Sequence, residues 1–592
     1  MTGYTLDFGD ALPANIDGVP IDSAPLTRMD GYGLGDPLLV SLPNVDLTGL
    51  ASEWNVAPSL SPDAEILWLE VDDEAGTLTQ IPYWLDVDAA TDPGARLTIV
   101  RPGVIMKEAT RYIVALRRLV DTDGDPIPTS AAFAGLRAGE APEGDPRQAR
   151  FDDLLTRLEA HGVATSELQI AWDFVTASSD ALHGPLLHMR DDAFAAVGER
   201  GPELLDVVAT DFEDAGEGGW AFELRGRFRV PHYMRGVPSF SDPDQEVWVF
   251  NDPDGDWRPD ANGWVEPEFI VRVPWSARDG APHGVMLYGH GQHGRLSQVG
   301  SFASIANEGK LIYVACDLWG MSEQDVGPTI DTLQDLSGFP RIADRLHQGI
   351  LNHLLLGRAM YRRLPLLAEM TDRGVVVDSD RVYYSGISQG GIYGPTIVAA
   401  SPDFIRGHFS VSGPQYAYLL LRSRNFAPFL LAIESFYPER AAQIVALQVL
   451  QQTWNGTDSL SYFPRLSRPL PGGQERRVLI TLAKGDVQVP PSANDMVARS
   501  DIGIPVMAHY DAERDTISGA TPAAYPRAGS GIVMYDFGNP WPAPSVLAPP
   551  TSEADDPHGI LRKQHHHTQQ LLHFLDTGEI IDVCGGDACS PD

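Results

Sequence analysis

The sequence predicts an α/β fold, in which a mostly parallel sheet is flanked by helices and preceded by a small β-sandwich-like domain. Two observations support this prediction. From about residue 268 onward, short apolar segments typical of buried strands alternate with helical patterns, which favours a parallel sheet covered on both faces. Before residue 139, short β-branched segments are separated by turns rich in Asp, Gly and Pro, which favours antiparallel strands.

The same patterns divide the 592 residues into three regions. Residues 1–138 are predicted to form a β-rich, Ig-like domain, and residues 139–199 a helical connector, because apolar residues recur there at helical spacing. Residues 200–592 are predicted to form the α/β domain, with residues 415–468 as a helical cap insertion rich in Leu, Phe and Tyr. The strand candidates are 64–71, 96–100, 110–116, 204–210, 221–230, 269–273, 284–288, 311–315, 382–384, 478–482 and 532–535.

The charge of the chain excludes some functions. Its 81 acidic and 43 basic residues give a net charge of -38, and an anionic surface repels phosphate backbones and anionic lipid headgroups. We therefore expect no nucleic-acid partner. No apolar run approaches the roughly 20 residues that cross a bilayer, so no transmembrane segment is expected either.

Three cysteines bear on the cellular compartment. Cys584 and Cys589 lie five positions apart with two glycines between them, a spacing that lets a small disulfide loop close, although two unpaired thiols are the alternative. A disulfide indicates an oxidising compartment. We expect an exported protein, periplasmic, surface-bound or secreted, whose signal peptide is absent from this sequence, and a cytoplasmic location stays open.

The segment Gly386-Ile-Ser-Gln-Gly390 carries the strongest chemical signal. It directly follows the strand candidate at 382–384 and precedes the helix-compatible residues 391–400. A serine between two glycines in a strand, sharp turn, helix context is typical of a nucleophile elbow, where a Cβ on either glycine would not fit. Ser388 is therefore the predicted nucleophile.

A serine hydroxyl needs a histidine to take its proton and a carboxylate to orient that histidine. In this architecture the chain order is Ser, acid, His. The acid is predicted at Asp486, which follows the strand candidate 478–482, with Asp495 as its main competitor.

The histidine is predicted at His558, in the loop Asp556-Pro-His-Gly559 between the last strand and the final helix. His565, His566 and His567 fall within that helix, where an imidazole is poorly placed to reach the serine and consecutive side chains point about 100° apart. Surface or packing roles are predicted for these three.

An oxyanion hole is predicted from backbone N–H groups. One donor is the N–H of Gln389, directly after the nucleophile. The other comes from the loop Tyr288-Gly-His-Gly-Gln-His-Gly294, with Gln292 or Gly291 as the candidates. For His290 and His293 in the same loop, roles in stiffening the loop or at the edge of the substrate are favoured over a second catalytic base.

No metal and no cofactor are predicted. The Asp-rich turns at 121–125 and 252–260 carry oxygen ligands that suit Ca²⁺, but neither has the spacing of an EF-hand. Solvated hairpin turns are the favoured interpretation of both.

Taken together, residues 288–294, 386–391, 485–486 and 556–559 resemble, in this order, the motifs of the α/β-hydrolase superfamily of serine esterases and lipases, over roughly residues 200–592. Within it, Asp317-Leu-Trp-Gly-Met-Ser322 and Arg345-Leu-His-Gln-Gly349 resemble segments of large exported bacterial esterases and lipases, including virulence-factor lipases. That resemblance implies an α/β-hydrolase fold behind an N-terminal β-rich domain.

The leading hypothesis is a carboxylic-ester hydrolase acting through Ser388, His558 and Asp486 on a hydrophobic acyl or aryl ester, either a small molecule or a polymer. An acyltransferase or a peptidase built on the same triad is an alternative. A surface-binding protein with a vestigial hydrolase domain is another. The oligomeric state stays open.

Overall fold

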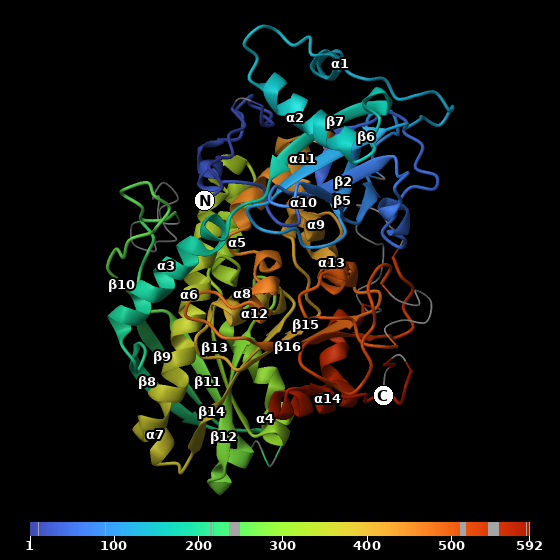
Figure 1. Cartoon of the computed structure of the whole chain (residues 1–592). Coiled ribbons are helices and arrows are strands. Elements are labelled where there is room, and N and C mark those ends of the chain that lie inside the picture. Colours follow the sequence, from blue (N-terminus) through green and yellow to red (C-terminus); the bar gives the residue numbers. More distant parts are fainter. Residues whose placement is uncertain are drawn as a thin grey trace.

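A computed structural model describes residues 1–9, 11–88, 90–212, 216, 218–235, 249–509, 517–542, 556–587 and 589–590. The lower part of the molecule in Figure 1 contains a large mixed sheet, and the upper part is built from residues near the N-terminus. In this view the cap helices α10 and α11 overlap the upper part, and α9 lies just below them.

The large sheet has ten strands in the order β10-β9-β11-β13-β12-β14-β15-β16-β18, with β8 paired to β9. Six neighbouring strands, β13, β12, β14, β15, β16 and β18, run parallel to one another. The strands β8, β9, β10 and β11 pair in antiparallel fashion at the other edge. The bounds are β8 Glu203–Asp211, β9 Trp220–Pro231, β10 Trp264–Val265, β11 Glu268–Pro274, β12 Pro282–Gly289, β13 Leu311–Cys316, β14 Val376–Ile387, β15 Arg406–Ser410, β16 Arg477–Ala483 and β18 Gly531–Tyr535. The predicted α/β class, with its mostly parallel sheet, thus describes the observed architecture.

Helices cover both faces of this sheet, which explains why its central strands are apolar on both sides. Tyr384 of β14 packs in the core beneath α3, α6 and α8, and the neighbouring Tyr383 packs in the opposite core beneath α4 and α14. Residues 342–357 of α6 are all buried, so this helix forms the centre of its layer. The bounds are α3 Ser179–Val197, α4 Ala303–Gly309, α5 Val326–Thr332, α6 Pro340–Arg362, α7 Ala368–Thr371, α8 Gln389–Ala400, α13 Asp495–Arg499 and α14 His565–Thr577.

The N-terminal domain contains two small antiparallel sheets, in the orders β1-β5-β4 and β3-β2-β6-β7. Their facing side chains, among them Trp68, Tyr83 and Val114, share one apolar core, as in a sandwich. Helices α1 and α2 cover the outer face of the second sheet. The bounds are β1 Leu38–Ser41, β2 Ile66–Asp72, β3 Thr77–Gln80, β4 Tyr83–Val87, β5 Leu97–Pro102, β6 Arg111–Arg117, β7 Leu168–Val175, α1 Ala131–Ala138 and α2 Arg147–Ala160.

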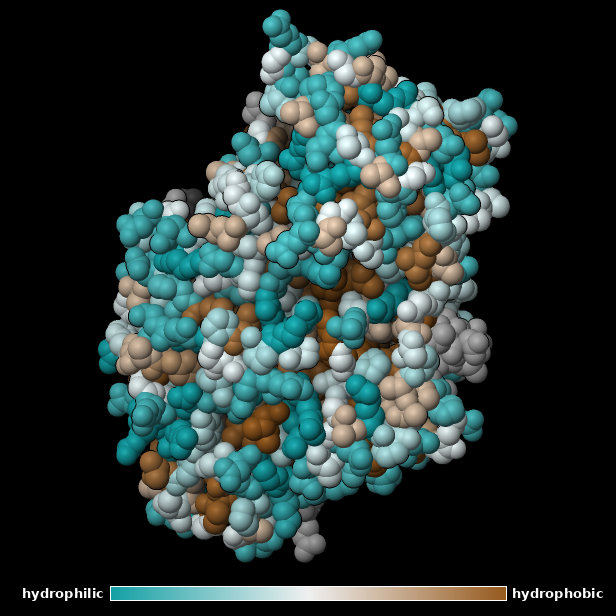
Figure 2. Space-filling model, viewed as in Figure 1, coloured by the Kyte–Doolittle hydropathy of each residue, from teal (hydrophilic) through white to brown (hydrophobic). Residues whose placement is uncertain are grey.

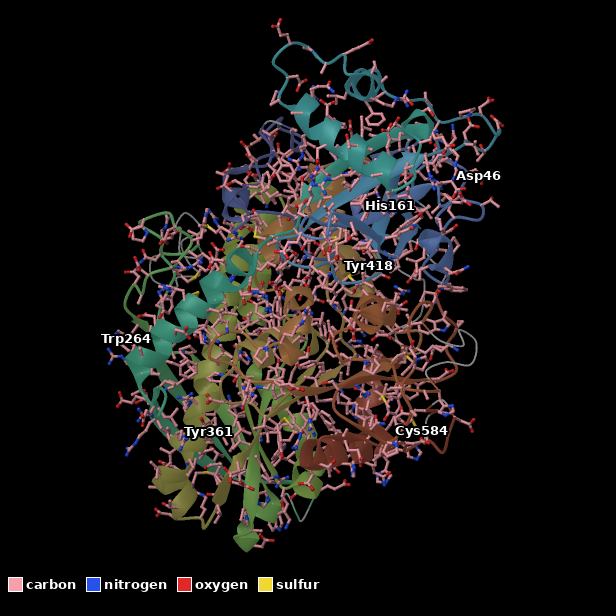
Figure 3. All side chains as sticks on the ribbon, in the orientation of Figure 1. Asp46, His161, Trp264, Tyr361, Tyr418 and Cys584 are labelled. Carbon is pink, nitrogen blue, oxygen red and sulfur yellow. A yellow bond between two sulfur atoms is a disulfide. The ribbon has the colours of Figure 1, made fainter. Side chains whose placement is uncertain are left out.

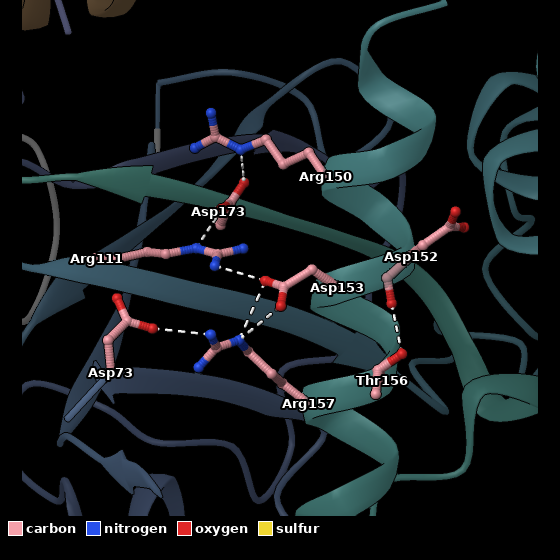
Figure 4. Close-up of polar contacts among 8 residues, drawn as sticks. All are labelled: Asp73, Arg111, Arg150, Asp152, Asp153, Thr156, Arg157 and Asp173. Carbon is pink, nitrogen blue, oxygen red and sulfur yellow. Dashed lines mark hydrogen bonds and ion pairs between the residues drawn. The ribbon is translucent and has the colours of Figure 1, made fainter. Parts of the chain in front are cut away.

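Ion pairs fasten α2 to this sheet (Figure 4). Arg111 of β6 contacts Asp153 of α2 and Asp173 of β7, each at 2.6 Å. Asp173 also accepts a bond from Arg150 of α2 at 2.5 Å, and Arg157 contacts Asp153 at 3.1 Å. The helix is therefore a part of the N-terminal domain.

This arrangement differs from the expected division at residues 139–199. The helices α2 and α3 lie there as expected, but β7 between them pairs with β6 along its whole length. Residues 139–175 thus complete the N-terminal domain, and a connector of helices alone does not describe them. The segment does carry a strand signal, because Leu168, Ile170, Trp172 and Phe174 alternate with Gln169, Ala171 and Asp173, and the interpretation of residues 139–199 as helical overlooks it.

The cap fills the interval between β15 and β16, and all of its regular elements are helical. It also packs against the N-terminal domain, where Arg422 and Arg101 share the carboxylate of Asp86 at 2.6 and 2.7 Å. Tyr418 lies at this junction in the middle of the molecule (Figure 3), with the Arg422 guanidinium 4.1 Å above its ring. The bounds are α9 Tyr416–Leu420, α10 Ala427–Phe436, α11 Arg440–Trp454 and α12 Phe463–Ser467.

Apolar side chains also reach the surface at the level of this junction, as brown patches between the upper and lower parts in Figure 2. Near the C-terminus, Cys584 and Cys589 are joined by a disulfide, and β17 Arg527–Ala528 pairs with β19 Glu579–Ile580. Within the described ranges, no helix combines the length and apolarity that a membrane span requires. The same residues contain no cluster of His, Cys, Asp and Glu arranged to hold a metal, and the Asp121 carboxylate instead accepts from the backbone of Asp123 and Asp125.

Candidate active site

Ser388 lies at the turn between β14 and α8, with φ 56° and ψ -121°. A non-glycine residue in this region is strained, and such strain is concentrated at functional sites. The turn closes only because its neighbours lack side chains: a Cβ on Gly386 would collide with the carbonyl of Gly390, and one on Gly390 with the carbonyl of Gly289. The predicted sharp turn is therefore present, with the serine at its apex.

Asp486 follows β16 and is buried. Its Oδ1 accepts from the backbone N–H groups of Gln488 and Val489 at 2.8 and 2.9 Å, which fixes the carboxylate. Its Oδ2 lies 2.7 Å from Nδ1 of His558. The structure thus brings the predicted acid and the predicted histidine together.

His558 belongs to the short 3-10 helix Pro557–Gly559, in the segment after β18. Asp556 begins that turn and accepts from the backbone N–H of His558 at 3.1 Å. Ser388, Asp486 and His558 therefore all follow the carboxyl ends of parallel strands, the edge at which ligands bind in open α/β sheets.

Ser388 and His558 line one cavity of about 570 Å³, a size typical of small-molecule sites. Among the described residues, no hydrogen bond joins Ser388 Oγ to the His558 ring, and bonds of this kind commonly tighten only when substrate is bound. The cavity also contains Gln292, Asn425 and Gln488 in its wall.

Electrostatics favour a charged form of His558. Burial alone lowers the pKa of its imidazole, but the charge of Asp486 and its hydrogen bond, with Asp556 beyond, outweigh burial and raise the pKa above its ordinary value. Burial raises the pKa of Asp486, and the neighbouring His558 offsets part of that effect. The pair is thus arranged to stabilise a proton on the histidine.

The three candidate oxyanion donors have different environments. Gln389 is the first residue of α8, so its N–H lies in the first helical turn, where donors have no partner within the helix. The N–H of Gly291 donates to Gln298 Oε1 at 2.9 Å and is therefore engaged. In the described part of the chain the N–H of Gln292 has no such bond, so the loop's available donor is that of Gln292.

The histidines of the 288–294 loop have separate surroundings. His290 is fully buried, with Nδ1 donating to Gly291 O at 2.8 Å and Nε2 accepting from Leu318 N at 2.8 Å, so it stiffens the loop. His293 lines the cavity at φ 46°, and its ring centroid lies 5.5 Å from that of Phe429 in the cap.

The competing residues are placed elsewhere. Asp495 lies in α13 and contacts Arg499 at 3.2 Å. His565 begins α14, and His567 is buried with its Nε2 3.3 Å from that of His408 beneath the sheet.

Sequence reasoning missed Asn425, Gln488 and Arg562 in the cavity wall. Gln488 could have been found by its position two residues after the predicted acid. No sequence pattern marks Asn425 as a site residue, because its position in the cavity wall depends on how the cap folds over the sheet.

Comparison with known proteins gives distant structural matches. No family model matches the chain, and no curated protein sequence matches it. Acetyl xylan esterase 1 from Thermoanaerobacterium sp. is 14% identical, with 66% of this chain and 92% of that chain covered and a TM-score of 0.34. An S-formylglutathione hydrolase from Agrobacterium tumefaciens is 14% identical over 63% and 99%, with a TM-score of 0.30.

A glucuronoyl esterase from Teredinibacter turnerae is 13% identical, with 64% of this chain and 80% of that chain covered and a TM-score of 0.28. Likeness at this level does not support an inference about function. The functional conclusion therefore depends on the geometry around Ser388.

Proposed function

We propose that this protein is a serine carboxylic-ester hydrolase with an α/β-hydrolase fold. One observation carries the proposal: a strained serine at a strand-to-helix turn and a histidine bound to a buried carboxylate line the same cavity. The chain order Ser388, Asp486, His558 is also that of the superfamily.

In the proposed reaction, Ser388 Oγ adds to the ester carbonyl carbon while His558 Nε2 takes the hydroxyl proton. Asp486 holds the ring through Nδ1 and stabilises its positive charge. The N–H groups of Gln389 and Gln292 donate to the oxyanion. His558 then gives its proton to the leaving alcohol. In the second half, His558 takes a proton from a water molecule that adds to the acyl carbon, and returns it to Ser388 Oγ as the acid leaves; the reaction uses no cofactor.

The acyl side of the substrate is proposed to be short and apolar. Behind His293 and Phe429 lies a second pocket of about 40 Å³ whose exposed lining is entirely apolar. Both residues also belong to the wall of the larger cavity, so the two spaces meet at these side chains, and the acyl group is proposed to enter the smaller one there. A space of about 40 Å³ admits roughly three or four heavy atoms, since one water needs about 10–15 Å³.

The alcohol side is proposed to be polar, because the hydroxyl of Ser301 and the guanidinium of Arg562 line the larger cavity. The disulfide between Cys584 and Cys589 further supports the proposal of an exported protein, because disulfides persist in oxidising compartments.

The test is hydrolysis of a p-nitrophenyl ester series from acetate to palmitate by the wild type and by Ser388→Ala. The proposal requires turnover that is best for acetate to butyrate and is lost in the variant. A best rate with long chains would contradict the assigned acyl pocket. Absence of turnover for every ester would favour the alternative of a binding protein with a vestigial hydrolase domain.

A further inference from the structure

Gln488 joins three segments that are far apart in the sequence. Its Nε2 donates to Asp556 Oδ2 at 2.8 Å, and its Oε1 accepts from Asn425 Nδ2 at 2.6 Å. A carboxylate offers acceptors, so the nitrogen must face Asp556 and the oxygen must face Asn425. The amide therefore has one orientation, and both of its ends are used.

Both partners of the proposed acid and base pair depend on this residue. The backbone N–H of Gln488 donates to Asp486 Oδ1 at 2.8 Å, and its side chain fixes Asp556. Asp556 in turn accepts from the backbone N–H of His558 at 3.1 Å. One glutamine thus contacts the carboxylate directly and the histidine through a second carboxylate.

The third contact reaches the cap. Asn425 lies in the 3-10 helix Arg424–Phe426, directly before α10, and the neighbouring Arg424 donates its backbone N–H to Val487 O at 2.9 Å. Asn425, Gln488 and His558 all line the cavity. A shift of the cap therefore pulls on the segment that carries the acid.

We propose that Gln488 and Asp556 are positioning residues that hold the turn of His558, and thereby its ring, next to Asp486. Through Asn425, this positioning depends on where the cap lies. This inference rests on the proposed function, because it assigns a role to residues behind the same base. The mechanism described above does not use Asp556, Gln488 or Asn425.

The charge of Asp556 provides a readout that a purely structural role would not affect. The charged groups acting on His558 are Asp486 from the loop after β16, Asp556 from its own turn and Arg562 from the following turn. Burial opposes the proton on His558, whereas Asp486 and then Asp556 raise its pKa. Removing the Asp556 charge must therefore lower that pKa.

The experiment compares Asp556→Asn, Gln488→Leu and Asn425→Ala with the wild type, using the pH dependence of kcat/KM for p-nitrophenyl acetate. Gln443→Leu is the matched control, since Gln443 is a buried glutamine of the cap that does not line the cavity. Asp556→Asn is expected to move the acidic limb to lower pH and to reduce kcat. Gln488→Leu is expected to reduce kcat roughly 10-fold with a smaller change in KM, the pattern of an interaction lost in the transition state.

Asn425→Ala is expected to reduce kcat/KM about threefold while leaving the acidic limb in place, because it breaks one neutral hydrogen bond. The control variant Gln443→Leu should keep the acidic limb of its kcat/KM profile at the wild-type pH. If the limb stays fixed in Asp556→Asn and kcat is unchanged in Gln488→Leu, the inference is wrong while the proposed function stands.

Wild type without any ester turnover would instead contradict the proposed function itself. If Asp556→Asn does not fold, the pH dependence of kcat/KM is measured for Asp556→Ser and for Gln488→Leu instead. Without the glutamine, Asp556 loses its fixed position, so the limb of Gln488→Leu is also expected to move; an unmoved limb in both variants would overturn the inference.

Discussion

The two sides of the cavity are held in different ways. On the sheet side, Ser388 is fixed by backbone geometry: a left-handed φ, glycines in contact with neighbouring carbonyls, and parallel strands buried on both faces. On the cap side, α9 to α11 are held by side chains, with buried ion pairs from Arg422 to Asp86 and from Arg440 to Asp88 in the N-terminal domain.

This difference assigns the reaction to the sheet side of the cavity and substrate selection to the cap side. Backbone geometry tolerates little change, which suits reacting groups that must meet to within tenths of an ångström. Side-chain contacts can be rearranged while the sheet stays intact, which suits the walls that select a substrate. The N-terminal domain is accordingly a support for the cap, joined to it by buried charges.

The largest expected effect is on the sheet side, at the nucleophile. Ser388→Ala should reduce kcat for p-nitrophenyl acetate by roughly 10⁴-fold or more, since the remaining groups cannot supply a nucleophile. The thermal unfolding midpoint should not fall, because removing the hydroxyl leaves the turn unchanged. Residual turnover near the wild-type rate would place the nucleophile elsewhere.

On the cap side, Asp86→Ala should be the most damaging change to stability. It leaves the buried guanidinium groups of Arg101 and Arg422 without their shared carboxylate, and breaking a buried pair costs about 3–5 kcal/mol. Urea unfolding measures the loss. The matched control is Asp211→Ala, whose exposed pair with Arg373 should contribute far less to stability than the buried pairs do.

Gly390→Ala should also destabilise the protein, by about 1–3 kcal/mol or more, because the added Cβ meets the backbone carbonyl of Gly289, and the buried helix α8 and strand β12 cannot move apart. Gly327→Ala is the control, since a Cβ there meets no atom within 4 Å. Equal midpoints of unfolding for the two variants would contradict the packing described for the turn.

Phe429→Ala tests the acyl pocket on the cap side with a smaller effect. Loss of the ring enlarges the apolar pocket where it meets the larger cavity, so the preferred acyl chain should lengthen, with a gain of several-fold for hexanoate or octanoate relative to acetate. Leu431→Ala on the same helix is the control, because Leu431 is 63% exposed and lines neither space. An unchanged chain-length profile would show that acyl groups bind elsewhere.

The smallest effect is a shift of pH dependence. His558 must be neutral to accept the serine proton, so activity falls as pH drops through its pKa. Since Asp486 and Asp556 raise that pKa, the midpoint of the acidic limb of kcat/KM should lie above about 6.5, the ordinary value for histidine. A midpoint below that value would mean that burial outweighs the carboxylates.

Much of the sheet side could be predicted from the sequence, because local patterns determine it. The glycines around Ser388, the strand before Asp486 and the loop around His558 each carry their own signal. β15 was not anticipated, since Gly407 and His408 interrupt an apolar pattern that only its two neighbouring strands restore. β7, by contrast, carries an alternating pattern, which the helical interpretation of residues 139–199 overlooks.

The cap side could not be predicted to the same extent. Residues 415–468 were expected to be helical and to form a cap, but their contacts with Glu53, Asp86 and Asp88 join segments more than 300 residues apart. The same applies to the amide of Gln488 between Asn425 and Asp556. Such pairs depend on tertiary packing, and a single sequence does not indicate them.

The most direct test of the central claim is covalent labelling with a fluorophosphonate probe, followed by peptide mass spectrometry to locate the adduct. The account predicts that the wild type is labelled on Ser388, that Ser388→Ala is not labelled, and that His558→Ala is labelled much more slowly. Labelling of another residue, or none in a folded wild type, would contradict it.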